Sequence, residues 1–211
     1  MPKLIYFPVQ GRAQAIRYLL DAKNVTYEDE RIGGDVWGPM KQAATYGAGS
    51  QLPIYVNDDG TYMTQSVAIL KSLAFDHGYA PTSGSVVFES EWFFATIGDV
   101  FEKPERYAMM KDDADEAAQT AALTVLTNTL DAFEGRFADG RAHVGGDHIT
   151  AADFGLLSMI TSAYENPNGK HALIREGAAA KLAGCPHVQR VLTPMRELCA
   201  ATIAALSASS L

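Results

Sequence analysis

Little cysteine, a shortage of positive charge and no long apolar run are the first features of this 211-residue sequence. Only Cys185 and Cys199 occur, so a disulfide framework is excluded, and two unpaired structural thiols in a reducing, cytoplasmic setting are expected. No stretch approaches the ~20 apolar residues that span a bilayer, and neither a signal peptide nor a basic amphipathic face for membranes is expected. Lys and Arg number 17 against 25 acidic residues, which disfavours nucleic-acid binding because phosphate contacts need clustered cations.

Several catalytic signatures are missing as well. The histidines are scattered without the spacing of metal ligands, at positions His77, His143, His148, His171 and His187. A Gly-x-Ser-x-Gly elbow is absent, and the glycines at 47, 49, 145 and 146 do not form a dinucleotide loop. Metal catalysis, serine hydrolysis and nucleotide-cofactor chemistry are therefore disfavoured, and no metal or cofactor is expected.

What the first 77 residues do contain is an alternation of strand and helix signals. Apolar or alternating runs predict strands and residues at helical spacing predict helices, in the order strand 3–7, helix 12–23, strand 25–32, helix 37–46, strand 52–56, strand 61–64 and helix 66–75. The turn Asn57-Asp58-Asp59-Gly60 joins the last two strands as a hairpin. A β-α-β unit implies a parallel pair with a right-handed crossover, so a small mixed sheet covered by helices is expected.

The rest of the chain has a helical pattern. Residues 78–84 have the composition of a linker between domains 1–77 and 85–211. A seam with spacings of four and three predicts a helical bundle, formed by Leu123, Leu126, Leu130, Phe133 and Phe137. Thr150 and Asp153 have the spacing of a capping box ahead of an apolar helix. The expected fold is therefore an α/β domain of order β-α-β-α-β-β-α followed by an all-α domain.

One short segment indicates a binding site. Pro53 begins an apolar run, where proline marks an edge or a bend because it lacks an N–H. If the Leu52–Pro53 peptide is cis, Leu52 turns its backbone outward, free to pair with a ligand. Ser66 then opens a helix, whose free N–H groups and dipole attract a carboxylate. Together these features predict a site for a small acidic peptide.

In order and spacing, a set of short motifs resembles the cytosolic glutathione transferases, in particular the tyrosine-using sigma, pi, alpha and mu classes. The residues that carry the resemblance are Leu4-Ile5-Tyr6-Phe7, Gly11-Arg12-Ala13, Tyr27-Glu28-Asp29-Glu30-Arg31, Trp37, Lys41, Gln51-Leu52-Pro53 and Gln65-Ser66-Val67-Ala68-Ile69. The resemblance covers the whole chain and implies a thioredoxin-like N-terminal domain with a helical second domain. One departure is the segment 46–51, which is a few residues longer than usual.

The resemblance implies that Tyr6 donates its hydroxyl to the sulfur of bound glutathione, with Arg12 near the sulfur or the glycyl end. A thiol with a pKa of ~8.5 is only a few per cent ionised at neutral pH. A hydrogen bond to the charged form stabilises the thiolate, so the nucleophile is carried by the cosubstrate. Glutathione is therefore a cosubstrate, and the expected activity is that of a detoxifying transferase.

Other residues receive roles in the same way. The resemblance implies glutathione contacts at Trp37, Lys41, Gln51, Leu52, Pro53, Gln65 and Ser66. It also implies that Asp99 reaches glutathione bound to a neighbouring subunit, and hence a homodimer. An apolar pocket for hydrophobic electrophiles is expected at Phe7, Val9, Tyr107 and Met110.

Three alternatives stay open or are excluded by the residues. Thioredoxin-like redox proteins share the strand and helix order but need a cysteine pair after the first strand, where this chain has Phe7-Pro8-Val9-Gln10-Gly11. Dithiol exchange at that place is therefore excluded. A non-catalytic ligand-binding relative and a glutathione-dependent isomerase of the prostaglandin type remain open.

Overall fold

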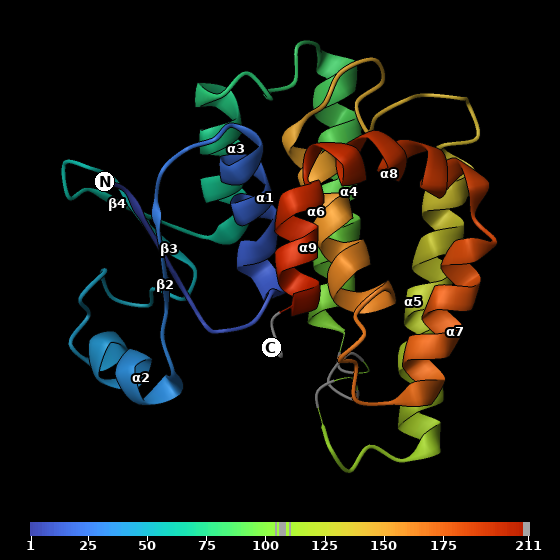
Figure 1. The fold of residues 1–211 in the computed structure, drawn as a ribbon, viewed down its shortest axis with the longest axis horizontal. Helices are drawn as coiled ribbons and strands as arrows, with labels where there is room; N and C mark the ends of the chain where they lie inside the picture. The colour runs from blue at the N-terminus through green and yellow to red at the C-terminus, as the bar shows by residue number, and fades with distance from the viewer. Residues whose placement is uncertain (104, 106–108, 110, 209–211) are drawn as a thin grey trace. The chain divides into compact units, whose positions relative to one another are not determined.

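The computed structural model describes residues 1–103, 105, 109 and 111–208 (Figure 1). The chain forms two compact units, which divide between Ala80 and Pro81. This boundary falls inside the segment 78–84 that composition marks as a linker. Each unit has its own hydrophobic core, and each is described separately below.

The first unit is a four-stranded mixed sheet with helices. Its elements are β1 (Lys3–Tyr6), η1 (Gly11–Ala13), α1 (Gln14–Ala22), β2 (Glu28–Arg31), α2 (Gly34–Gln42), β3 (Ile54–Val56), β4 (Tyr62–Thr64) and α3 (Ser66–Asp76). The strand order is β2-β1-β3-β4, with β1 parallel to β2 and the other pairs antiparallel. The predicted order of elements and the mixed sheet are confirmed.

The second helix spans 34–42 and not the predicted 37–46. Two further boundaries differ from the sequence pattern for local reasons. The first helix begins as a 3₁₀ turn because Gly11 has φ +43°, which an α-helix does not accommodate. The second strand is shorter than 25–32 because the N–H of Val25 still donates to the carbonyl of Leu20 and closes the end of α1. Pairing with the N-terminal strand begins only at Glu28, whose N–H donates to the carbonyl of Pro2.

The core of this unit lies between the sheet and the pair α1 and α3, which run side by side (Figure 1). Seven consecutive residues of α1, from Gln14 to Leu20, are buried, including the polar Gln14 and Arg17. On the sheet side, Leu4, Ile5 and Ile54 are at most 1% exposed. Burial of large aliphatic side chains at about 1.5–3 kcal/mol each is the main stabilising contribution here.

The second unit is helical, as expected. Its described helices are α4 (Gly84–Glu102), α5 (Glu116–Arg136), α6 (Ala151–Met159), the π-helical turn η3 (Ile160–Tyr164), α7 (Ala172–Ala183), α8 (Pro186–Leu198) and α9 (Ala200–Ala208). Every residue of α6 is buried, so this helix is the centre of the unit. The predicted seam residues Phe133 and Phe137 stack on Phe93 of α4, with ring centroids 4.5 and 5.1 Å apart.

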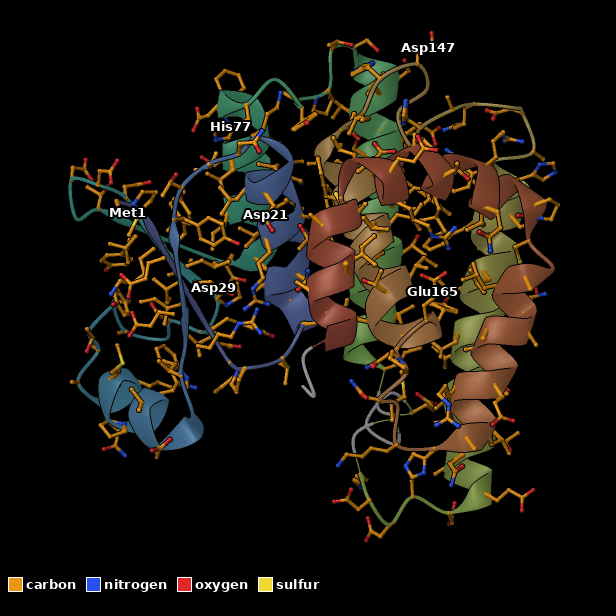
Figure 2. The ribbon with its side chains drawn as sticks, viewed as in Figure 1. Met1, Asp21, Asp29, His77, Asp147 and Glu165 are labelled. Atoms are coloured by element: carbon orange, nitrogen blue, oxygen red, sulfur yellow. The ribbon has the colours of Figure 1, made fainter. Side chains whose placement is uncertain are left out.

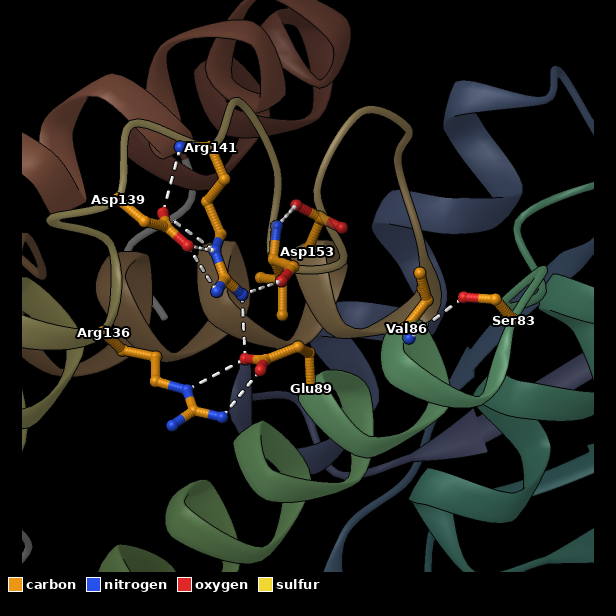
Figure 3. A network of polar contacts seen from close by, with 8 residues as sticks. Ser83, Val86, Glu89, Arg136, Asp139, Arg141 and Asp153 are labelled. Carbon is orange, nitrogen blue, oxygen red and sulfur yellow. Dashed lines mark hydrogen bonds and ion pairs between the residues drawn. The ribbon is translucent and has the colours of Figure 1, made fainter.

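A buried polar network fixes the start of α6 (Figure 3). The Asp153 carboxylate accepts the N–H of Val144 at 2.8 Å and both the N–H and the hydroxyl of Thr150, at 2.8 and 3.0 Å. The predicted capping box is therefore confirmed. Beside it, Glu89 of α4 accepts bonds from Arg136 and Arg141 at 2.6–2.9 Å, and Arg141 also bonds Asp139. This network ties α4, α5 and the loop before α6 together.

The two cysteines are buried and form no disulfide, as predicted. Burial raises the pKa of the Cys185 thiol, whose S–H donates to the carbonyl of Lys181. A thiol held protonated in this way is a poor nucleophile, so its role is structural. Among the described helices, none has the length and apolar character needed to cross a membrane.

Candidate active site

The strand register brings the predicted site residues of the first unit to one edge of the sheet. Ile5 lies opposite Ile54, and Ile54 lies opposite Thr64. Because these pairs are antiparallel, the next residues along each strand, Tyr6, Pro53 and Gln65, continue the same row. Residues more than 40 positions apart in the chain are therefore neighbours. The sequence pattern predicted each strand, and the pairing shows that their ends meet.

Tyr6 is held by the turn that follows β1. Its hydroxyl oxygen accepts the backbone N–H of Arg12 at 3.1 Å, and the side chain is 8% exposed. Gly11 approaches the ring so closely that a Cβ atom there would lie 2.7 Å from the hydroxyl oxygen. A phenol oxygen that accepts an N–H keeps its own proton to donate elsewhere. The turn thus fixes both the position of the hydroxyl and the direction in which it can donate.

Leu52 and Pro53 stand beside Tyr6 at the start of β3. Their peptide bond is cis, the geometry expected to turn the Leu52 backbone outward. Leu52 is 9% exposed, yet no backbone hydrogen bond of this residue is found in the part of the chain that the structure describes. Buried backbone groups are normally paired, so this segment is suited to pair with an extended ligand. Gln51, one residue earlier, is exposed.

Gln65 and Ser66 form the start of α3. Gln65 has φ +71° and ψ 104°, a conformation that is unfavourable for a residue with a side chain. Ser66 is the first residue of the helix. The first N–H to donate a helical hydrogen bond is that of Ile69, which bonds the carbonyl of Gln65. The N–H groups at 66–68 therefore have no intrahelical acceptor, which makes this helix start suitable for a carboxylate.

Trp37 and Lys41 lie one turn apart on α2, as predicted. Their exposure differs: Trp37 is only 9% exposed, whereas Lys41 is exposed. The chain reaches α2 directly from the site edge, because the N–H of Ile32, just after β2, donates to the carbonyl of Tyr6 at 2.8 Å. The burial of Trp37 shows that it is anchored in the unit and is not a freely exposed surface residue.

The residues expected around the electrophile are only partly placed. Phe7 is half-buried and its ring tilts against that of Tyr6, with centroids 5.7 Å apart, while Val9 is 47% exposed. Tyr107 and Met110 lie outside the described residues. Asp99 is an exposed residue of α4 in the second unit, and Arg12 is an exposed residue beside Tyr6.

Arg17 is a further residue near the site, to which none of the sequence motifs pointed. This residue is 2% exposed and is bonded to Asp29 of β2 and to the loop after β1. The available signal was a charged residue inside the apolar helix 12–23, together with the acidic run of the next strand. No group of His, Cys, Asp or Glu side chains among the described residues is arranged to hold a metal ion.

A thioredoxin-like sheet whose first strand ends in an anchored tyrosine, followed by a helical unit, defines the class of glutathione-binding transferases. The comparisons agree with this class. The protein-family model of the glutathione S-transferase C-terminal domain matches residues 116–193 of this sequence. Glutathione S-transferase P 1 of Bufo bufo is 30% identical over 166 residues, covering 74% of each chain. Hematopoietic prostaglandin D synthase of Gallus gallus is 32% identical over 155 residues, covering 72% of this chain and 74% of that protein.

A solved structure supports the same fold. The pi-class glutathione S-transferase of Onchocerca volvulus has a TM-score of 0.74 at 24% identity and covers 93% of this chain and 88% of that one. The chain belongs to the glutathione S-transferase family. The predicted family, fold class and enzyme class are confirmed.

Proposed function

We propose that this protein activates glutathione as a thiolate, held by the Tyr6 hydroxyl, for attack on hydrophobic electrophiles. The observation that carries the proposal is the hydrogen bond from the Arg12 N–H to the Tyr6 oxygen at 3.1 Å. It leaves the phenol proton free to donate to sulfur. Lowering a thiol pKa by about 2 units takes roughly 2.7 kcal/mol and makes thiolate the main species near neutral pH. A single well-placed donor to a charged acceptor supplies about 1.5–3 kcal/mol of this.

The tripeptide would be held along the same edge of the sheet. The Leu52 backbone beside Pro53 would pair with the cysteinyl residue, with Gln51 adding a side-chain contact. Gln65, Ser66 and the start of α3 would bind the γ-glutamyl carboxylate. Trp37 and Lys41 would bind the glycyl carboxylate, through the indole N–H and the ammonium group, and Arg12 would lie near the sulfur.

Two further assignments extend this proposal. Phe7 and Val9, with Tyr107 and Met110, would form the apolar wall for the electrophile. Asp99 would reach the glutathione of a second subunit, which makes a homodimer part of the proposal. Phe88 on α4 supports a partner at this helix, because its large apolar side chain is 58% exposed. We also propose a cytoplasmic location, since glutathione is the required cosubstrate and both thiols are reduced.

The test is a titration of the bound thiol combined with a conjugation assay. Ultraviolet absorbance of thiolate gives the pKa of glutathione on the wild type and on Tyr6→Phe, and a chlorinated nitroaromatic gives turnover. We expect a lowered thiol pKa in the wild type, a pKa near the free value in Tyr6→Phe, and a loss of turnover of about tenfold or more. Tyr62→Phe, at a 45% exposed tyrosine of β4, is the matched control and should behave as the wild type.

The result also separates the proposal from a purely ligand-binding role. If glutathione binds but the wild type and Tyr6→Phe are equally inert, the transferase proposal fails. A second candidate activity is a glutathione-dependent prostaglandin isomerase, favoured by the similarity to the Gallus gallus prostaglandin D synthase. The same thiolate would then act on a bound prostaglandin precursor, so that assay is run in parallel on both variants.

A further inference from the structure

Arg17 is a buried cation that none of the proposed glutathione contacts uses. Its side chain is 3% exposed, and its Nε donates to both Asp29 oxygens at 3.1 Å. Asp29 is a residue of β2, and its carboxylate accepts the bond from Arg17 of α1 (Figure 2). The guanidinium therefore links the middle of α1 to the parallel edge of the sheet.

The other side of the guanidinium holds the segment that follows Tyr6. Nη1 of Arg17 donates to the carbonyl of Val9 at 3.0 Å and to that of Gln10 at 3.4 Å. The guanidinium carbon also lies 5.9 Å from the centroid of the Tyr6 ring, within the range of a cation–π contact. One side chain thus contacts the phenol ring and the chain that leads to the turn at Gly11.

This arrangement is costly to maintain. Burial lowers the pKa of Arg17, although Asp29 opposes that effect. Nη2 of Arg17 has no hydrogen-bond partner and neither has Nε2 of Gln14, whose Oε1 accepts from Arg17 at 3.3 Å. Replacing Arg17 and Asp29 together by apolar side chains of similar size would avoid these unmet bonds at little cost to stability. Packing alone therefore does not account for an arginine here, whereas a requirement for fixed loop geometry does.

We propose that Arg17 is a positioning residue for thiolate formation: it fixes the loop from Phe7 to Gln10 and, through it, the direction of the Tyr6 hydroxyl. The inference rests on the proposed function of Tyr6. In the described part of the chain the hydrogen bonds of Arg17 go to β2, to α1 and to this loop, and its guanidinium lies over the ring of Tyr6. The proposed glutathione-holding residues on α2, β3 and α3 are not among them. Loss of Arg17 should therefore alter thiol ionisation and turnover and leave binding of the tripeptide backbone intact.

Arg17→Lys is the first test, because lysine keeps the charge but cannot bond Asp29 and two carbonyls with a planar fork. We expect kcat to fall about tenfold or more, since small displacements of a catalytic group cost up to about a hundredfold. The pKa of bound glutathione should rise toward its free value. The Kd of S-methylglutathione, which has no thiol to ionise, should stay within about twofold of wild type, because only the thiol contact depends on Tyr6.

Two further variants keep the test decisive. Asp29→Asn weakens the anchor of the guanidinium without touching the loop, and should shift the thiol pKa in the same direction by less. Arg141→Lys is the matched structural control, because Arg141 is also largely buried, bonds Glu89 and Asp139, and donates to the carbonyl of Val144. It should lower the melting temperature and leave the thiol pKa unchanged.

The outcomes distinguish this inference from the function on which it rests. If wild type lowers the thiol pKa and Arg17→Lys lowers it equally while losing only thermal stability, the positioning role is overturned. If the wild-type protein itself leaves the thiol pKa unshifted, the proposed role of Tyr6 is overturned, and that of Arg17 with it. A raised thiol pKa in both Arg17→Lys and Asp29→Asn, with unchanged S-methylglutathione binding, supports the proposal.

Discussion

A Cβ atom on Gly11 would stand 2.7 Å from the hydroxyl oxygen of Tyr6 and 3.0 Å from its Cε1. The φ of Gly11 is +43°, in the region that favours glycine. Glycine is thus required at this turn for two independent reasons, one conformational and one steric. The close approach is also what allows the next residue, Arg12, to direct its N–H at the phenol oxygen.

Gly11→Ala should therefore displace the Tyr6 hydroxyl. We expect turnover to fall about tenfold or more, and the free energy of unfolding to fall by about 1–3 kcal/mol from the strained backbone. Steady-state kinetics and urea denaturation measure the two effects. Gly135→Ala is the control, because a Cβ on this helical glycine of α5 meets nothing within 4 Å. It should keep full activity and gain up to about 1 kcal/mol of stability. Normal turnover in Gly11→Ala would contradict the proposed geometry.

The strained backbone of Gln65 predicts a trade between stability and binding. Gln65→Gly removes the side chain from a conformation with φ +71° and should raise the free energy of unfolding by up to about 1 kcal/mol. Glutathione should bind more weakly, because the proposed side-chain contact is lost. Gln65→Ala separates the effects, since it loses the contact but keeps the strain. Calorimetry gives the Kd of glutathione for each variant, and melting curves give the stability. If Gln65→Gly binds glutathione as tightly as the wild type, the Gln65 side chain is not part of the site.

Gln14→Glu should stabilise the first unit. The amide Nε2 of Gln14 is buried without a hydrogen-bond partner, while its Oε1 accepts from Arg17. A carboxylate removes the unsatisfied donor and turns the existing bond into a charge-assisted one, for a gain of about 1 kcal/mol. Chemical denaturation at pH 7 measures the change. Gln14→Met, which loses the bond to Arg17, should be less stable than the wild type, and a glutamate variant no more stable than the methionine one would refute this explanation.

The Glu89 network predicts a loss of stability in acid. Hydrogen bonds from Arg141 hold the pKa of Asp139 at about 2, against an ordinary value of 3.8. Burial by itself raises the pKa of Glu89, but bonds from Arg136 and Arg141 outweigh it and hold the pKa below 4.5. Because both pKa values are lower in the folded state, the stabilisation is complete above pH 4.5 and is lost as the pH falls toward 2.

Glu89→Gln tests this acid dependence. At pH 7 the variant should be less stable by about 2 kcal/mol, because Arg136 and Arg141 lose a charged partner in a partly buried site. The difference should shrink as the pH falls below 4.5 and through the lowered pKa of Glu89, since protonation of the wild-type carboxylate removes the same charge. Unfolding midpoints measured from pH 7 to 2.5 show whether the two curves converge. Parallel curves would mean that the network does not titrate as proposed.

The fold was accessible from the sequence because its signals are local. The run Lys3 to Phe7, the hairpin turn after Val56 and the pair Thr150 and Asp153 each depend on residues a few positions apart, and each gave a correct element or cap. The ends of elements were less accessible. The start of α1 and the length of β2 depend on the φ of Gly11 and on a bond from Val25 to Leu20, neither of which leaves a periodic pattern.

The candidate site was likewise predictable from the sequence only in part. Sequence alone determined the candidate chemistry. The resemblance to the glutathione transferases gave Tyr6 its role, and a Leu-Pro step and a serine opening a helix each suit a ligand group. Only the tertiary structure decided that these residues meet, because strand pairing brings Tyr6, Pro53 and Gln65 into one row across more than 40 residues of chain. It also decided which residues hold them there. Arg17 supports Tyr6 through bonds to Asp29 and Val9, and such contacts depend on folded distances that no spacing in the sequence encodes.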